Sequence, residues 1–275
     1  RSCLVGSEMC IRDRYKVGGI DEINGKTGLA HYLEHLLFHG TKKYPKDEMD
    51  KLISSFGGSH NAFTSYDFTC YYQNIPKEYL ENVMDMESDR MRNIILEEEQ
   101  TKIERDIVLE ERLMRRDNSP KAVLGEKLRA ALYGEDHPYG RPLIGYEDDI
   151  AGLTHQDALD FYNKYYYPNN AILVLAGDIT KEQAIPLVNK YYGALETGPK
   201  LNVTYAKTKN KVIEKTASHS DKNTSNVTIN IAYLAPDALS KENHQYSYAL
   251  TMIAYLLADH KNAPLYKKII LNCIL

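Results

Sequence analysis

Residues 28–40, "GLAHYLEHLLFHG", carry a His-x-x-Glu-His group inside an otherwise apolar run. Imidazole and carboxylate groups are costly to bury without a partner, so this run needs a reason to contain them. We expect it to form a short helix that follows an N-cap at Thr27. Positions four apart share one face of a helix. His31 and His35 would therefore point the same way, with Glu34 beside them.

This arrangement suits a catalytic zinc site. Neutral imidazoles are good zinc ligands, and a catalytic zinc ion takes three protein ligands plus a water molecule. The Glu34 carboxylate could accept a proton from that water as it attacks a carbonyl carbon. The simpler alternative is a pair of structural histidines, and a five-residue motif alone does not exclude it.

A third ligand is expected from the acidic helix predicted over "EEEQTKIERDIVLEERLMRRD". Ile103, Ile107 and Val108 mark the side of this helix that we expect to be buried. Glu104 and Glu111 are seven residues apart in the sequence. Both therefore lie on one side of the helix, close to that stripe. Spacing leaves both carboxylates open as the third ligand.

The rest of the chain alternates helical patterns with β-branched and aromatic runs. "SHNAFTS" and "DFTCYYQNI" predict a β-hairpin, and "NAILVLAGDI" predicts a strand. Further along, "SNVTINIAYL" predicts a strand and "HQYSYALTMIAYLLADH" predicts a helix. The predicted fold class is α+β.

Composition excludes several other functions. The 275-residue chain has a net charge of -4, so it offers no basic field for a nucleic acid. It contains no run of 18 apolar residues, so we expect no membrane span. The cysteines have no metal-ligand spacing; they are Cys3, Cys10, Cys70 and Cys273.

Longer stretches indicate a family. HxxEH is the inverted zinc-protease motif. With "GGSHNAFTSYDFTCYY", "ERDIVLEE" and "YYYPNNAILVLAGDI" in the same order, residues 15–275 resemble the pitrilysin family, and in particular its bacterial members that are similar to processing peptidases. The resemblance implies an antiparallel-rich sheet packed against helices, as in one half of pitrilysin or of a mitochondrial processing peptidase. A truncated second copy of that unit would follow.

The resemblance also assigns roles to individual residues. The family's zinc ligands fall on His31, His35 and Glu111, and its general base falls on Glu34. Glu104 matches the family's second acidic residue on the same helix, which would orient a ligand or the water. One Zn²⁺ ion is expected for each catalytic domain.

Substrate would bind along "HNAFTS", which matches the family's edge strand. An extended peptide can add to such an edge as a further strand, because edge strands expose unpaired N–H and C=O groups. Asn61 and Ala62 would lie nearest the scissile bond, with Phe63 on the opposite face. Without the resemblance, an ordinary hairpin packed in the sheet would be the better interpretation.

These expectations divide the chain into four parts. Residues 1–14, "RSCLVGSEMCIRDR", have no signal-peptide core and no strand or helix period. We interpret them as an artefactual segment similar to translated sequencing-adapter sequence, and exclude them from the fold. Residues 15–198 are the expected catalytic zinc-peptidase domain and 199–208 a linker. Residues 209–275 are the expected start of a second homologous domain that grips substrate.

The predicted function is that of a zinc-dependent endopeptidase acting on peptides or unfolded protein segments. The alternative is a non-hydrolytic peptide-binding or assembly subunit of the same family. The expected partners are a peptide substrate and either the missing second half or a homologous subunit. We expect the chain by itself to bind zinc but to cleave peptides poorly or not at all. Expected compartments are a bacterial periplasm or cytoplasm.

Overall fold

The computed structural model describes the chain apart from residues 1–7, 202–213, 223, 226, 236–243 and 272–275. The chain forms two compact units, and the boundary between them falls between Thr228 and Ile229. Most of the predicted linker at residues 199–208 lies outside the described residues.

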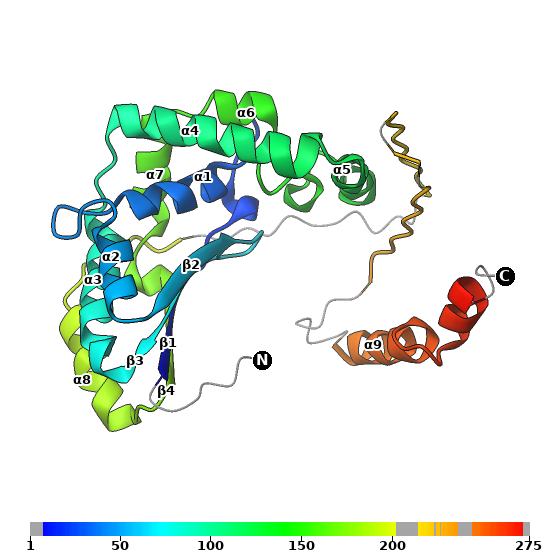
Figure 1. Cartoon of the computed structure of the whole chain (residues 1–275). Coiled ribbons are helices and arrows are strands. Elements are labelled where there is room, and N and C mark those ends of the chain that lie inside the picture. Colours follow the sequence, from blue (N-terminus) through cyan, green and yellow to red (C-terminus); the bar gives the residue numbers. More distant parts are fainter. Residues whose placement is uncertain (1–7, 202–213, 223, 226, 236–243, 272–275) are drawn as a thin grey trace. The chain divides into compact units, whose positions relative to one another are not determined.

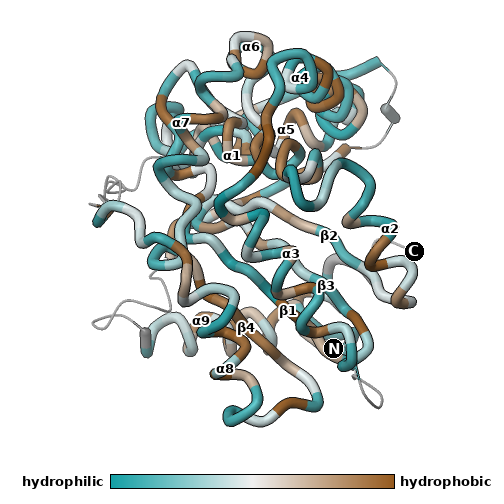
Figure 2. Tube along the Cα trace, turned by 90° about the vertical axis from the view of Figure 1, so that its left-hand side faces the viewer, coloured by the Kyte–Doolittle hydropathy of each residue, from teal (hydrophilic) through white to brown (hydrophobic). Residues whose placement is uncertain are grey.

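The first unit is built on a four-stranded sheet with the order β2-β3-β1-β4 (Figure 1). Every pairing between neighbouring strands is antiparallel. The hairpin and the later strand predicted from the sequence are confirmed as β2 with β3 and as β4, which is strongly hydrophobic (Figure 2). The strands are β1 (Glu8–Tyr15), β2 (Ser59–Thr64), β3 (Thr69–Pro76) and β4 (Ala171–Gly177).

The exclusion of residues 1–14 from the fold is wrong in part, because residues 8–14 lie inside β1. β1 is an inner strand that pairs with both β3 and β4. Met9, Ile11 and Tyr15 are buried at alternate positions. Asp13 lies between Ile11 and Tyr15 on the same buried face. This carboxylate breaks the apolar alternation by which a strand is predicted, so the period was not visible in the sequence.

Helices cover one face of the sheet and gather near its β2 end. Figure 1 shows α2, α3 and α8 along one face, while α1 packs against β2, α4 and α7. The helices predicted around the HYLEH motif and over the acidic stretch are confirmed as α1 and α4. The helices of this unit are α1 (Leu29–Leu36), α2 (Glu48–Ser55), α3 (Leu80–Asn93), α4 (Glu98–Arg112), α5 (Pro120–Tyr133), α6 (Glu147–Ala151), α7 (His155–Tyr165) and α8 (Lys181–Tyr191).

The start of α1 differs from the predicted N-cap at Thr27. Gly28 takes the N-cap position with φ +86°, and the Thr27 hydroxyl instead donates to Asp149 at 2.6 Å. The buried Glu22 carboxylate accepts the N–H groups of Gly28 at 2.9 Å and Ala30 at 2.8 Å. A carboxylate from outside the helix therefore satisfies the first N–H groups of the helix that carries the histidines.

In the second unit the structure describes α9 (His244–Ala258) and a short π-helical segment, Tyr266–Leu271. α9 confirms a predicted helix. The strand predicted over "SNVTINIAYL" does not form in its described residues, where Ile229 and Ile231 are 79% and 75% exposed. A strand needs a partner strand, and none in the described part of the chain pairs with this segment.

Among the helices that the structure describes, none is long and apolar enough to cross a bilayer.

Candidate metal centre

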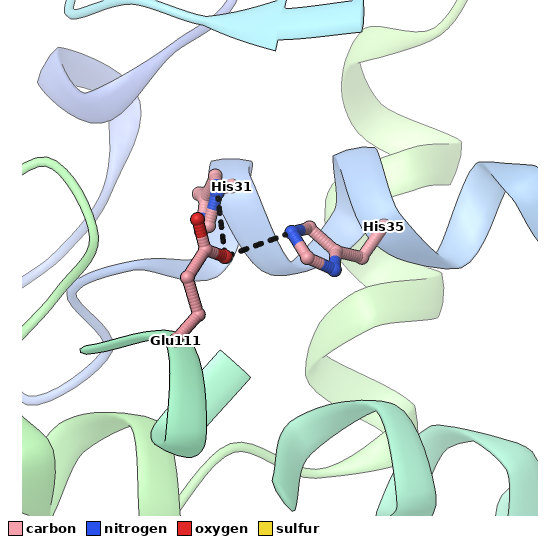
Figure 3. A group of neighbouring side chains, drawn as sticks. All are labelled: His31, His35 and Glu111. Carbon is pink, nitrogen blue, oxygen red and sulfur yellow. Dashed lines mark ion pairs between the residues drawn. The ribbon is translucent and has the colours of Figure 1, made fainter. Parts of the chain in front are cut away.

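Two imidazoles from α1 and one carboxylate from α4 meet at a single point (Figure 3). His31 and His35 lie one turn apart with ring centroids separated by 4.7 Å. Glu111 Oε2 lies 3.2 Å from His35 Nε2 and 3.6 Å from His31 Nε2. One ligand atom from each of the three residues lies within 4.8 Å of the others. In the described part of the chain, this is the one such group of metal-binding side chains.

The hydrogen bonding of Glu111 fits a cation at this point. Arg115 binds the other carboxylate oxygen, Oε1, at 2.6 Å. Oε2 is buried and accepts no hydrogen bond, although two imidazole nitrogens face it. A buried carboxylate oxygen that accepts no hydrogen bond is unfavourable, and a cation between the three side chains would satisfy it. Two imidazoles and one carboxylate are also a donor set of catalytic zinc, which leaves one coordination position open.

The two histidines differ in their affinity for protons. Burial and the neighbouring charge of His35 lower the pKa of His31 to about 4. Burial also disfavours the charged form of His35, but the carboxylates of Glu104 and Glu111 outweigh it and raise the His35 pKa to about 9. The adjacent His35 imidazole in turn lowers the pKa of Glu111. At neutral pH, His31 is therefore already in the neutral form that binds metals, whereas His35 holds a proton.

Glu104 lies on the opposite side of the His35 ring from Glu111. His35 Nδ1 is 2.9 Å from Glu104 Oε1, and His39 Nε2 is 2.8 Å from Glu104 Oε2. Burial raises the Glu104 pKa, but the hydrogen bonds with both histidines outweigh that effect and lower it to about 2. Of the two carboxylates that spacing left open, Glu111 faces the Nε2 atoms and Glu104 binds Nδ1 of His35.

The side of α4 that faces the protein interior carries Glu104 beside Val108, and not the two isoleucines, which corrects the predicted buried stripe. Ile103 and Ile107 are 55% and 47% exposed, and only Val108 of the three is buried. Glu104 and Glu111 point inward instead, because imidazoles from α1 provide them with partners. A polar helix side becomes favourable to bury once its charges are paired.

Glu34 lies on α1 between the two histidines and is 8% exposed. Its Oε2 accepts a hydrogen bond from the Thr64 hydroxyl at the end of β2. Burial raises the pKa of Glu34, and the bond from Thr64 partly offsets that rise. Thr64 was not among the predicted site residues, because nothing within β2 indicates which helix it faces.

β2 lies at one edge of the sheet and packs against α1. Asn61 and Phe63 are exposed on one face, while Ala62 and Thr64 are partly buried on the other. Asn61 Oδ1 accepts the N–H of Ala62 at 2.8 Å. The structure thus puts all three predicted substrate residues on an edge strand beside α1, but with Asn61 on the face of Phe63.

Comparisons with known proteins agree with this geometry. The sequence model described as "Insulinase (Peptidase family M16)" matches residues 15–147, which include every residue of the centre. The model described as "Peptidase M16 inactive domain" matches residues 152–271. The chain belongs to the M16 peptidase family. The predicted resemblance to the pitrilysin family is therefore confirmed.

The relatives that this chain matches are longer proteins than the chain itself. The zinc protease PqqE of Helicobacter pylori is 38% identical over 182 residues, which are 66% of this chain and 41% of that protein. A crystal structure of a protease from Helicobacter pylori matches with a TM-score of 0.84 and 30% identity, over 98% of this chain and 64% of that one. Pitrilysin, at 24% identity and a TM-score of 0.61, covers 74% of this chain and 22% of its own, and shares the fold. The predicted α+β fold is confirmed, and the chain spans about 41% of the length of its curated M16 relative.

Proposed function

We propose that this chain provides the metal-binding half of a zinc endopeptidase that cleaves peptides or unfolded protein segments. The observation that supports the proposal is the meeting of His31, His35 and Glu111 around an unsatisfied carboxylate oxygen. That donor set leaves room for water and substrate, as a catalytic zinc site requires.

The chemistry divides among residues with separate tasks. Zinc bound at this centre would polarise the peptide carbonyl and lower the pKa of a water molecule. Glu34 accepts a proton from the attacking water and returns it to the leaving amine nitrogen. The Thr64 hydroxyl orients Glu34, and Glu104 orients His35 through Nδ1.

The peptide substrate would add to the free edge of β2 as an extended strand. Main-chain hydrogen bonds along that edge bind a peptide with little regard to its side chains. The side chain of Asn61 accepts the hydrogen bond of the Ala62 N–H, so an incoming peptide would replace that side chain as the acceptor. Phe63, exposed on the same face as Asn61, would contact substrate side chains. The second half of the enzyme, or a homologous subunit, would close over the bound peptide.

Zinc content and peptide cleavage, measured on wild type and on Glu34→Gln, test this function. The substitution keeps the size of the side chain and removes its capacity as a base. We expect both proteins to bind one zinc ion. With the second half or a homologous subunit present, we expect cleavage of an unstructured peptide by wild type to exceed that by the variant by about 10²–10⁴-fold.

Two results would contradict the proposal. Equal cleavage by both zinc-loaded proteins would remove Glu34 as the base. Zinc binding without cleavage by either protein, measured with that second half or subunit present, would favour the alternative, a non-hydrolytic peptide-binding or assembly subunit.

A further inference from the structure

His39 belongs to none of the groups that the proposed chemistry uses. It ends the 3-10 turn Leu37–His39, which directly follows α1. Its side chain is 5% exposed, and Nε2 lies 2.8 Å from Glu104 Oε2. Its other ring nitrogen, Nδ1, is buried and has no hydrogen-bond partner among the residues that the structure describes. The single polar contact that holds this ring in place is therefore the one to Glu104.

That contact completes the hydrogen bonding of the Glu104 carboxylate. Oε1 binds Nδ1 of His35 at 2.9 Å, and Oε2 binds His39. With both oxygens occupied, the carboxylate cannot rotate about its last bond without breaking a hydrogen bond. Since the ionised Glu104 carboxylate can only accept hydrogen bonds, Nε2 of His39 carries the proton that it donates to Glu104.

The fixed carboxylate also determines the orientation of His35. A carboxylate that accepts the Nδ1 proton of an imidazole keeps Nε2 as the free, metal-binding nitrogen. Nε2 of His35 is the atom that faces Glu111. His39 thus contacts Glu104, Glu104 contacts His35, and His35 faces the proposed metal position.

We propose that His39 is a positioning residue that strengthens metal binding at this centre by fixing Glu104 and, through it, His35. The inference rests on the proposed zinc site and adds a residue to it. The proposed role depends on the hydrogen bond from His39 to Glu104 and not on the volume of the ring. It therefore differs from a role in packing alone.

Two substitutions separate the hydrogen bond from the packing. His39→Gln places an amide N–H near the position of Nε2, so it retains a donor to Glu104. His39→Leu fills similar space without a donor. His155→Gln serves as the control, because His155 lies on α7 and its Nε2 binds the Leu96 carbonyl at 2.8 Å. The readouts are the zinc dissociation constant by chelator competition, the absorption spectrum of the Co²⁺-loaded chain, and the thermal midpoint of the metal-free chain.

We expect His39→Leu to weaken zinc binding about 10-fold or more and to change the Co²⁺ spectrum. His39→Gln and His155→Gln should remain within about 3-fold of wild type, in the range of ordinary substitutions that spare the hydrogen bonds. If His39→Leu does not fold, His39→Asn replaces it, because its shorter amide does not reach Glu104.

Different results would overturn the two proposals. Unchanged zinc affinity and an unchanged Co²⁺ spectrum in His39→Leu would refute the role of His39. Equal weakening in the Leu and Gln variants would also refute it, since packing alone would then explain the loss. Failure of wild type to bind zinc would instead overturn the proposed metal site.

Discussion

The hydroxyl of Thr64 donates a hydrogen bond to the carboxylate of Glu34. It joins the last residue of the edge strand β2 to the last turn of α1, the helix that carries His31 and His35. The strand on which a peptide would bind therefore also orients the group that would act as the base. The positions of the substrate and of the base would then both depend on β2, which is six residues long.

Removing that hydroxyl should impair hydrolysis without removing the metal. Thr64→Val keeps the shape of the side chain, and Thr64→Ser keeps the donor. A hydrogen bond to a charged group contributes about 1.5–3 kcal/mol, so we expect kcat to fall about 10- to 100-fold in Thr64→Val. Zinc content should stay the same, and Thr64→Ser should retain most of the activity.

The same variant should shift the pH dependence of hydrolysis. The Thr64 hydroxyl lowers the pKa of Glu34, so its loss raises that pKa. A base works in its deprotonated form, so the acidic limb of the kcat/KM profile should move to higher pH in Thr64→Val. A profile and a rate that match those of wild type would show that Thr64 does not act on Glu34.

Zinc binding should release a proton at neutral pH. The pKa of His35 in the metal-free chain is about 9, so this residue is protonated at pH 7 and must lose its proton to bind zinc. His31, with a pKa of about 4, has no proton to lose. We expect about one proton released per zinc ion between pH 6 and 8. Calorimetry in buffers with different ionisation enthalpies measures this number.

Above pH 9 the release should disappear, because His35 is then neutral before zinc arrives. Zinc affinity should accordingly rise with pH up to about 9 and then level off. His35→Ala should bind zinc weakly and release no proton at pH 7. Zinc binding by wild type without proton release at pH 7 would contradict the contact between His35 and the two carboxylates.

The inward side of α4 can be tested by stability measurements on adjacent positions. Ile107 is 47% exposed, whereas Val108 is fully buried. We expect Ile107→Ser to change the free energy of unfolding by less than about 0.5 kcal/mol. Val108→Ala should reduce it by about 1–2 kcal/mol, because it removes two buried methyl groups. Urea unfolding of both variants measures the difference, and a larger loss for Ile107→Ser would mean that the helix is rotated.

The part of the centre that sequence could predict is the part fixed within one helix. His31, Glu34 and His35 follow from helical spacing alone. Choosing Glu111 over Glu104 required the resemblance to a family, since both lie on the same side of α4. Residues that act between elements gave no local signal, and Thr64 on β2 is the clearest case.

The errors in the fold have a related cause. Ile103 and Ile107 were expected to be buried, because the sequence of a helix does not show which side chains of other helices it contacts. Here those side chains are imidazoles of α1, which pair with the carboxylates of α4. The part of β1 before Tyr15 was not predicted, because the buried Asp13 replaces an apolar residue in its alternation. Burial raises the pKa of this carboxyl to about 8, so Asp13 is buried mainly in its neutral form at neutral pH. A protonated aspartate is far less costly to bury than a carboxylate.

X-ray absorption at the zinc edge of the zinc-loaded chain tests most directly whether the three side chains bind one ion. We predict nitrogen and oxygen ligands at about 2.0–2.2 Å, including two imidazoles, and the loss of one oxygen ligand or of the ion itself in Glu111→Ala. A sulfur ligand at about 2.3 Å, or a wild-type spectrum unchanged in Glu111→Ala, would contradict the proposed centre.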